Sequence, residues 1–263
     1  MRIATALVVL FVVLAVIGPW IAPQDPGAID LAAQYQTPSG AHWLGTSDNG
    51  IDLASAMLHG ARLAGVIALF VVGFSALFGT LVGAAAGYFG GAADRVFVSL
   101  ADVVQAFPGI VLYVAILALV DRPGVTHVIV ALCVPSWVLY ARIARAEALS
   151  LRGAEFVQAA VVLGAKPSRV LGRHVLPNLV GPIVIQATSG VGGVILAEST
   201  LSFLGLGPSG GVSWGALLDQ GSAVLLRFPH VALIAGSAIA LTVLGFNLTG
   251  DALRDRLDPR TAR

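Results

Sequence analysis

Long uninterrupted runs of apolar residues dominate the chain and set its architecture. Six such runs occur, near residues 3–22, 63–88, 97–120, 124–146, 179–204 and 229–250. A membrane-spanning helix needs about 20 mainly apolar residues. The runs are continuous rather than alternating, which argues against a transmembrane β-barrel. The pattern therefore predicts an all-α integral membrane protein with six transmembrane helices.

Composition supports a membrane protein that forms one helical domain over residues 1–263. Hydrophobic residues make up 57% of the chain and charged residues 11%, whereas soluble domains carry roughly 25% charged residues. The first run ends in GPWIAPQDP, without a small-x-small cleavage site, so we expect a retained helix rather than a secretory signal. The single cysteine, Cys133, excludes an internal disulfide and is expected to be a packed thiol.

Lysine and arginine are unevenly divided between the two sets of connecting segments. With the N-terminus in the cytoplasm, three of the 15 lie outside, namely Arg62, Arg122 and Arg227. Cytoplasmic segments carry an excess of these residues, so both termini are predicted to be cytoplasmic. Segment 23–62 then becomes an extracytoplasmic loop with one short helix near 51–60. Segments 147–178 and 251–263 become a cytoplasmic loop and a cytoplasmic tail.

Several kinds of chemistry have no support in the sequence. There is no G-x-x-x-x-G-K-[ST] phosphate loop, no H-E-x-x-H and no G-x-S-x-G. The five histidines are scattered, with no spacing that suggests a metal site. We therefore expect no catalytic residues, no metal, no cofactor bound by this chain and no nucleic-acid partner.

Two charged residues fall inside or beside predicted spans. An ionisable residue within a span indicates a functional site by default. Glu198 lies in the fifth span and could line a pathway, contact a neighbouring subunit or relay protons. No second carboxylate is nearby, which favours the first two roles. Asp102, near the start of the third span, is expected to cap a helix or pair with Arg95.

Glycines recur every four residues in the second span, at Gly79, Gly83 and Gly87. Small residues at this spacing lie on one helix face and let a second helix approach closely. The stripe could serve packing within the chain, a subunit interface or the wall of a pathway.

The predicted cytoplasmic loop contains the polar, helix-forming stretch EFVQAAVVLGAKPSRVLGRHVLPN, residues 155–178. Phe156, Ala160 and Leu163 fall on one face of a first short helix. Gly164 is suited to end that helix in a left-handed conformation, and Pro167 to start a second one. A small apolar face flanked by charges indicates a protein partner, by insertion of a helix into a groove. The alternative is a helix that lies on lipid headgroups.

This stretch resembles the cytoplasmic EAA loop of ABC-importer permeases, E-A-A-x3-G-x9-I-x-L-P. The matching positions are Ala159, Ala160, Gly164, Leu176 and Pro177. Gln158 replaces the Glu of the motif, and His174 replaces its apolar residue. Further stretches, among them HWLGTSDNGIDLASAMLHGAR, ILAESTLSFLGLG and FNLTGDALRDRLDPR, are similar to the C-type subunit of the dipeptide/oligopeptide/nickel class of permeases.

The resemblance implies a type I ABC importer permease fold in the cell membrane of a prokaryote. The implied partners are a homologous permease, two ATPase subunits or one two-domain ATPase, and an extracytoplasmic substrate-binding protein. ATP and Mg would be bound by the ATPases, so this chain would be no enzyme. The residues implied to contact an ATPase are Glu155, Phe156, Gln158, Ala159, Ala160, Leu163, Gly164, Lys166 and Arg169.

Other functions remain open from the sequence. Within the family, the cargo could be a di- or oligopeptide, nickel or another small ligand. An ion-coupled secondary transporter with Glu198 as the proton carrier is a rival, although it would need no docking loop. A purely structural membrane protein is disfavoured by the long polar insert.

Overall fold

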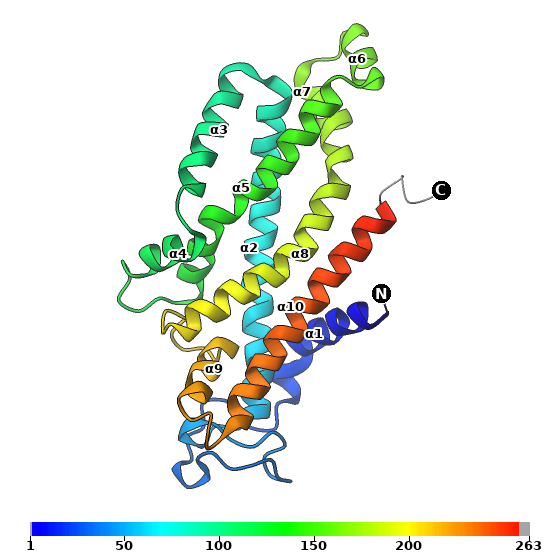
Figure 1. The fold of residues 1–263 in the computed structure, drawn as a ribbon. Coiled ribbons are helices and arrows are strands. Elements are labelled where there is room, and N and C mark those ends of the chain that lie inside the picture. The colour runs from blue at the N-terminus through cyan, green and yellow to red at the C-terminus, as the bar shows by residue number, and fades with distance from the viewer. Residues whose placement is uncertain (1, 258–263) are drawn as a thin grey trace.

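The computed structural model describes residues 2–257, which form a bundle of helices (Figure 1). The helices are α1 (Arg2–Ile21), α2 (Leu53–Phe89), α3 (Gly91–Gln105), α4 (Gly109–Leu117), α5 (Val125–Arg152), α6 (Glu155–Val162), α7 (Pro167–Val170), α8 (Leu176–Phe203), α9 (Trp214–Ala223) and α10 (Pro229–Leu257). Two 3-10 turns, Leu31–Ala33 and Asp48–Gly50, lie between α1 and α2, and a π-helical turn, Leu171–Val175, joins α7 to α8. Within this part of the chain no strand is present, which confirms the all-α prediction.

Within residues 2–257, five helical segments are long and apolar enough to cross a membrane. They are α1, α2, α5, the continuous segment Pro167–Phe203 and α10. Their ranges overlap five of the six predicted spans. The predicted tail is helical as far as Leu257, and Arg260 and Arg263 lie outside the described residues.

The third predicted span, 97–120, is wrong as a single helix. It consists of α3 and α4, which meet at an angle of 79°. Pro108 stands at the break and caps α4. Proline lacks the N–H that an α-helix needs, and its ring disfavours helical backbone at the residue before it, here Phe107. The pair forms either one broken span or a re-entrant segment.

The boundaries of the second span also differ from the prediction. The expected separate helix near 51–60 is the first part of α2, so the loop ends at residue 52 rather than 62. Asp52 fixes this start, because its carboxylate accepts hydrogen bonds from the backbone N–H and the hydroxyl of Ser55, both at 2.8 Å. The short helix α9 was not predicted at all, since its ten residues fall far below the length of a span.

The polar segments gather at opposite ends of the bundle. Figure 1 shows α6 and α7 at one end and the 22–52 loop at the other, with α9 on the side of that loop. The core lies where α2, α5 and α8 meet, and Ile67, Leu132 and Ile195 are fully buried there. The long helices therefore connect two polar ends of the molecule.

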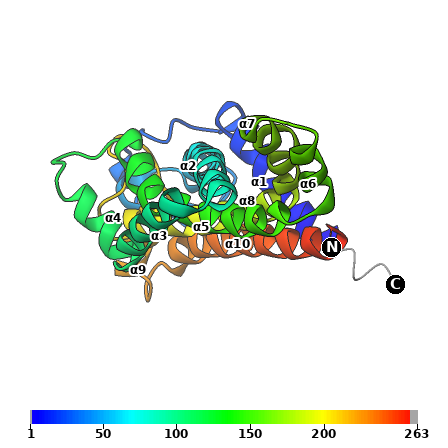
Figure 2. The same ribbon diagram turned by 90° about the horizontal axis from the view of Figure 1, so that it is seen from above.

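Direct backbone contact joins α2 to α5, which stand side by side in Figure 2. A β-carbon at Gly83 would overlap the backbone of Ala141 on α5. Gly79 and Gly87 meet α5 carbonyl oxygens one turn to either side in the same way. The glycine stripe therefore serves packing within the chain, one of the three roles left open, and not a subunit interface or a pathway wall.

Ion pairs fasten α3 to α5. Arg145 binds Asp94 through two nitrogens, one of them 2.7 Å from Oδ2. Arg142 lies 2.6 Å from Asp102. The expected pairing of Asp102 with Arg95 is wrong, because seven residues along one helix separate the two by about 10 Å.

The glycine contact predicts which substitution will destabilise the bundle. Gly83→Ala should force α2 and α5 apart and lower the stability by about 1–3 kcal/mol, in the range of overpacked cores. Gly73→Ala is the matched control, because Gly73 lies on the same helix and a β-carbon there meets nothing within 4 Å. Thermal unfolding in detergent measures both variants, and equal unfolding temperatures would contradict the assignment.

Candidate functional site

The sequence between α5 and α8 folds into two short helices with a glycine corner between them. Beyond α6, the N–H of Gly164 donates to the carbonyl of Val161 at 2.9 Å, and the N–H of Ala165 donates to that of Ala160 at 3.0 Å. This pair of bonds is a Schellman motif, which requires a left-handed residue. Gly164 supplies it with φ +79°, and Pro167 then starts α7. The predicted left-handed glycine and the start at Pro167 are confirmed, whereas the expected second short helix is wrong as a separate element, because the helical segment that starts at Pro167 continues to Phe203.

One face of α6 is anchored to the transmembrane helices. Val157 is 1% exposed and packs in a cluster with Ala148 of α5 and Leu179 of α8. Ala160 is half-buried against the same cluster. The predicted outward face of Phe156, Ala160 and Leu163 is therefore wrong at Ala160, because that position faces the protein's own core.

The opposite face of α6 and the corner itself expose apolar side chains. Phe156 is 46% exposed, Val162 85% and Leu163 87%. Ala159 is exposed between them. Because one face of α6 is packed against the transmembrane helices and the other exposes apolar side chains, the helix presents a rigid patch of the kind that binds a partner. We call these four residues the α6 patch.

The remaining predicted residues surround this patch and are exposed. They are Glu155, Gln158, Gly164, Lys166 and Arg169. The amide of Gln158 donates a hydrogen bond to the carbonyl of Arg152 at 2.6 Å, which satisfies a backbone group at the end of α5. An ionised glutamate at this position has no proton to donate. The replacement of the usual Glu thus gives a link within the loop.

Glu198 lies apart from the loop, near the end of α8, and is 1% exposed. Its Oε1 accepts hydrogen bonds from the hydroxyls of Ser202 at 2.7 Å and Ser213 at 2.9 Å. The side chain therefore lies in a packed junction inside the subunit. In this conformation it faces neither an exposed surface nor an open groove.

A polar groove of about 350 Å³ lies between α2, α4, α5 and α8. Its polar side chains are neutral and include Ser75, Tyr113, Ser136 and Gln186. Ser75 is fully buried, and its hydroxyl has no nitrogen or oxygen partner among residues 2–257. A β-carbon at Gly190 would overlap the hydroxyl of Tyr140, so a larger residue there would displace that ring in the groove.

This groove was not predicted from the sequence. Its signal was present as isolated hydroxyl and amide residues within apolar runs, such as Ser75, Ser136 and Gln186. Polar residues in a span tend to face the bundle interior or a water-filled cavity. The sequence pattern does not show how residues from four separate apolar runs come together.

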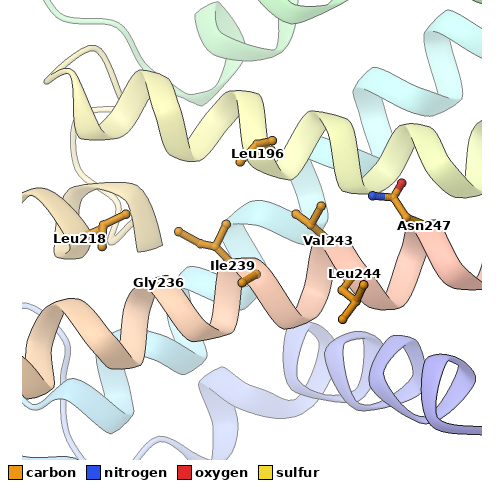
Figure 3. A pocket seen from close by; sticks show the side chains of 8 residues that line it. Leu196, Leu218, Gly236, Ile239, Val243, Leu244 and Asn247 are labelled. Atoms are coloured by element: carbon orange, nitrogen blue, oxygen red, sulfur yellow. The ribbon is translucent and has the colours of Figure 1, made fainter.

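A second cavity, of about 330 Å³, is apolar and lies between α8, α9 and α10. Figure 3 shows its wall, formed by leucine, isoleucine and valine side chains with Asn247 at one side. It offers no acid, base or nucleophile among its described lining residues. Nor does any group of three His, Cys, Asp or Glu side chains come together within residues 2–257.

Family comparisons match nearly the whole chain. Residues 79–263 match the family described as binding-protein-dependent transport system inner membrane component. Residues 2–38 match the N-terminal transmembrane domain of oligopeptide transport permease C. The first of these matches alone covers more than half of the sequence.

Individual relatives agree with these matches. The dipeptide transport system permease protein DppC of Alkalihalophilus pseudofirmus is 36% identical over 95% of this chain and 82% of its own length. The probable D,D-dipeptide transport system permease protein DdpC of Escherichia coli is 36% identical over 98% and 86%. The glutathione transport system permease protein GsiD of Shigella dysenteriae is 40% identical over 98% and 85%. The chain therefore belongs to the family of binding-protein-dependent transport system inner membrane components, as a membrane permease subunit and not an enzyme.

Proposed function

We propose that this chain is one of two homologous permease subunits of an ATP-driven importer that carries di- or oligopeptides. The observation that carries the proposal is the α6 patch, an anchored helix whose apolar side chains are left exposed by the rest of residues 2–257. The relatives of this chain are named for dipeptide and glutathione transport, which favours peptide cargo over nickel. ATP and Mg would be bound by separate ATPase subunits, and this chain would need no cofactor.

The charge distribution supports an orientation with α6 and both termini in the cytoplasm. Twelve of the 15 lysines and arginines then lie on the cytoplasmic side. The 22–52 loop, at the far end of the bundle, would face the extracytoplasmic binding protein. In this arrangement, one end of the subunit would contact the binding protein and the other end an ATPase.

Coupling follows from how the loop is attached. The α6 patch would insert into a groove on an ATPase, with Lys166 and Arg169 at its rim. From Pro167 to Phe203 the chain is one continuous helical segment. A displacement of the docked corner by closure of the ATPases would therefore be passed directly to α8, which contributes to the polar groove.

In our proposal, the polar groove is the part of the peptide pathway that this subunit contributes. Its lining offers hydroxyls and an amide but no charged side chain among the described residues. Neutral donors and acceptors suit the peptide backbone, which carries one N–H and one C=O per residue. Passage then relies on hydrogen bonds that form and break easily, without a strongly held charge.

An ion-coupled mechanism finds less support. Asp94 and Asp102 are engaged by arginines of α5, and Glu198 is enclosed by serine hydroxyls.

We therefore expect dipeptide uptake by proteoliposomes that contain the full transporter to require internal ATP and the binding protein. A proton uncoupler should leave the initial rate unchanged. Uptake that is abolished by the uncoupler and indifferent to ATP would contradict the importer.

The docking role predicts a severe effect of charge on the α6 patch. Phe156→Asp should abolish ATP-driven uptake, because a carboxylate would have to be buried in the groove of the ATPase. Membrane insertion should be intact, since the side chain is not part of the core. Phe156→Leu, which keeps an apolar contact, is the matched control. Normal uptake by the Asp variant would refute docking through this face.

The pathway assignment predicts a transport defect at Gln186. Gln186→Leu should lower peptide uptake by about tenfold, the effect of losing one or two hydrogen bonds to the cargo. Val184→Leu is the control, because Val184 is an exposed apolar residue of the same helix. Basal ATP hydrolysis and assembly should be normal in both variants. Equal uptake rates would remove Gln186 from the pathway.

A further inference from the structure

The buried carboxylate of Glu198 lies at the junction of the helical segment Pro167–Phe203 with the short helix α9. Enclosing an ionisable group in a span is costly unless hydrogen bonds satisfy it. Two hydroxyls do so here, and they come from different elements. Ser202 is one turn further along α8, whereas Ser213 directly precedes α9. An apolar residue would fill the same space without joining these elements.

Ser213 has two tasks at once. Its hydroxyl accepts a hydrogen bond from the N–H of Gly215 at 3.1 Å and so caps the first turn of α9. The same hydroxyl donates its proton to Glu198. The start of α9 also touches α8 directly, because a β-carbon at Gly215 would overlap the carbonyl oxygen of Ser199. The carboxylate of Glu198 therefore holds the Ser213 hydroxyl in place, and that hydroxyl holds the first turn of α9.

The same turn of α9 reaches the remaining bundle through Trp214. This side chain is buried, and its Nε1 donates to the carbonyl of Met57 on α2 at 2.9 Å. Its ring meets Phe11 of α1 edge-on, with centroids 5.9 Å apart. In the preceding loop, the N–H of Ser209 donates to the carbonyl of Pro123 at 2.7 Å. The junction thus gathers α1, α2, α8 and the segment before α5.

The other end of the same helical segment is the corner formed by α6 and α7. The segment from Pro167 to Phe203 contains 37 residues, so it is about 55 Å long at 1.5 Å per residue. A displacement at Pro167 reaches α9 only if α9 is fastened to α8 near residue 203. Glu198 supplies that fastening by hydrogen bonds, beside the backbone contact at Gly215.

We propose that Glu198 is a positioning residue that locks α9 to α8, so that the face toward the binding protein and the ATPase end move as one body. The inference rests on the proposed importer function. Loss of the lock would leave ATP hydrolysis possible but would disconnect it from arrival of the loaded binding protein. Glu198 is not among the residues that pack with α6 or line the polar groove, so neither depends on it for its structure.

The test uses the complete transporter in proteoliposomes, with ATP hydrolysis measured with and without peptide-loaded binding protein. Glu198→Leu, which fills the space but accepts no hydrogen bond, should lower the stimulation by about tenfold while basal hydrolysis is kept. Glu198→Gln should keep most of the stimulation, because its amide oxygen still accepts from both serines. Ser222→Ala, at the far end of α9, is the control and should behave as the parent protein.

Hydrogen exchange supplies a second measurement that does not depend on turnover. Amides of residues 214–218 should lose protection in Glu198→Leu, and those of α6 should not. Full stimulation in Glu198→Leu, or equal losses of basal and stimulated hydrolysis, would overturn the lock. If Glu198→Leu fails to assemble, Ser213→Ala takes its place with the same expected loss. A parent transporter that is never stimulated by a binding protein would refute the importer itself, and that result is distinct from failure of the lock.

Discussion

The close approach of α2 and α5 is the contact from which the arrangement of the other helices follows. Within a bilayer the hydrophobic effect does not drive helices together, because lipid is as apolar as their side chains. Association depends on how many atoms touch, and the glycine stripe around Gly83 brings two backbones into direct contact. The position of α5 then sets that of α3, through two arginine–aspartate pairs, and that of α6, which begins three residues after α5 ends.

The second organising feature is the helical segment from Pro167 to Phe203, which is joined to a neighbouring element near each end. At one end, Val157 of α6 packs beside Val170 and Leu179. At the other, Glu198 holds the cap of α9. Apolar packing holds the first junction and hydrogen bonds hold the second, so neither can slide without losing its contacts. In the proposed importer, motion of one end would therefore reach the other through a helix rather than through a flexible loop.

The polar groups inside the spans also distinguish kinds of transport chemistry. The groove between α2, α4, α5 and α8 has no charged side chain among its described lining residues, and Asp102 and Glu198 are engaged by other partners. As the proposed pathway, it would hold its cargo weakly and would rely on an external protein for selection and on an external motor for direction. This division of work agrees with the family to which the chain belongs, whose description names a binding protein.

The amino-acid sequence by itself determined five of the six predicted spans, since an apolar run of span length has no other way to satisfy its backbone in lipid. It also determined the corner at Gly164 and Pro167, because those conformations depend on local residue chemistry. Only the tertiary structure decided which α6 face is buried, since Val157 and Phe156 are equally apolar and the choice depends on α5 and α8. The partners of Asp102, Gly83 and Glu198 were likewise decided by the tertiary structure, because each contacts an element distant in the chain that no local pattern specifies.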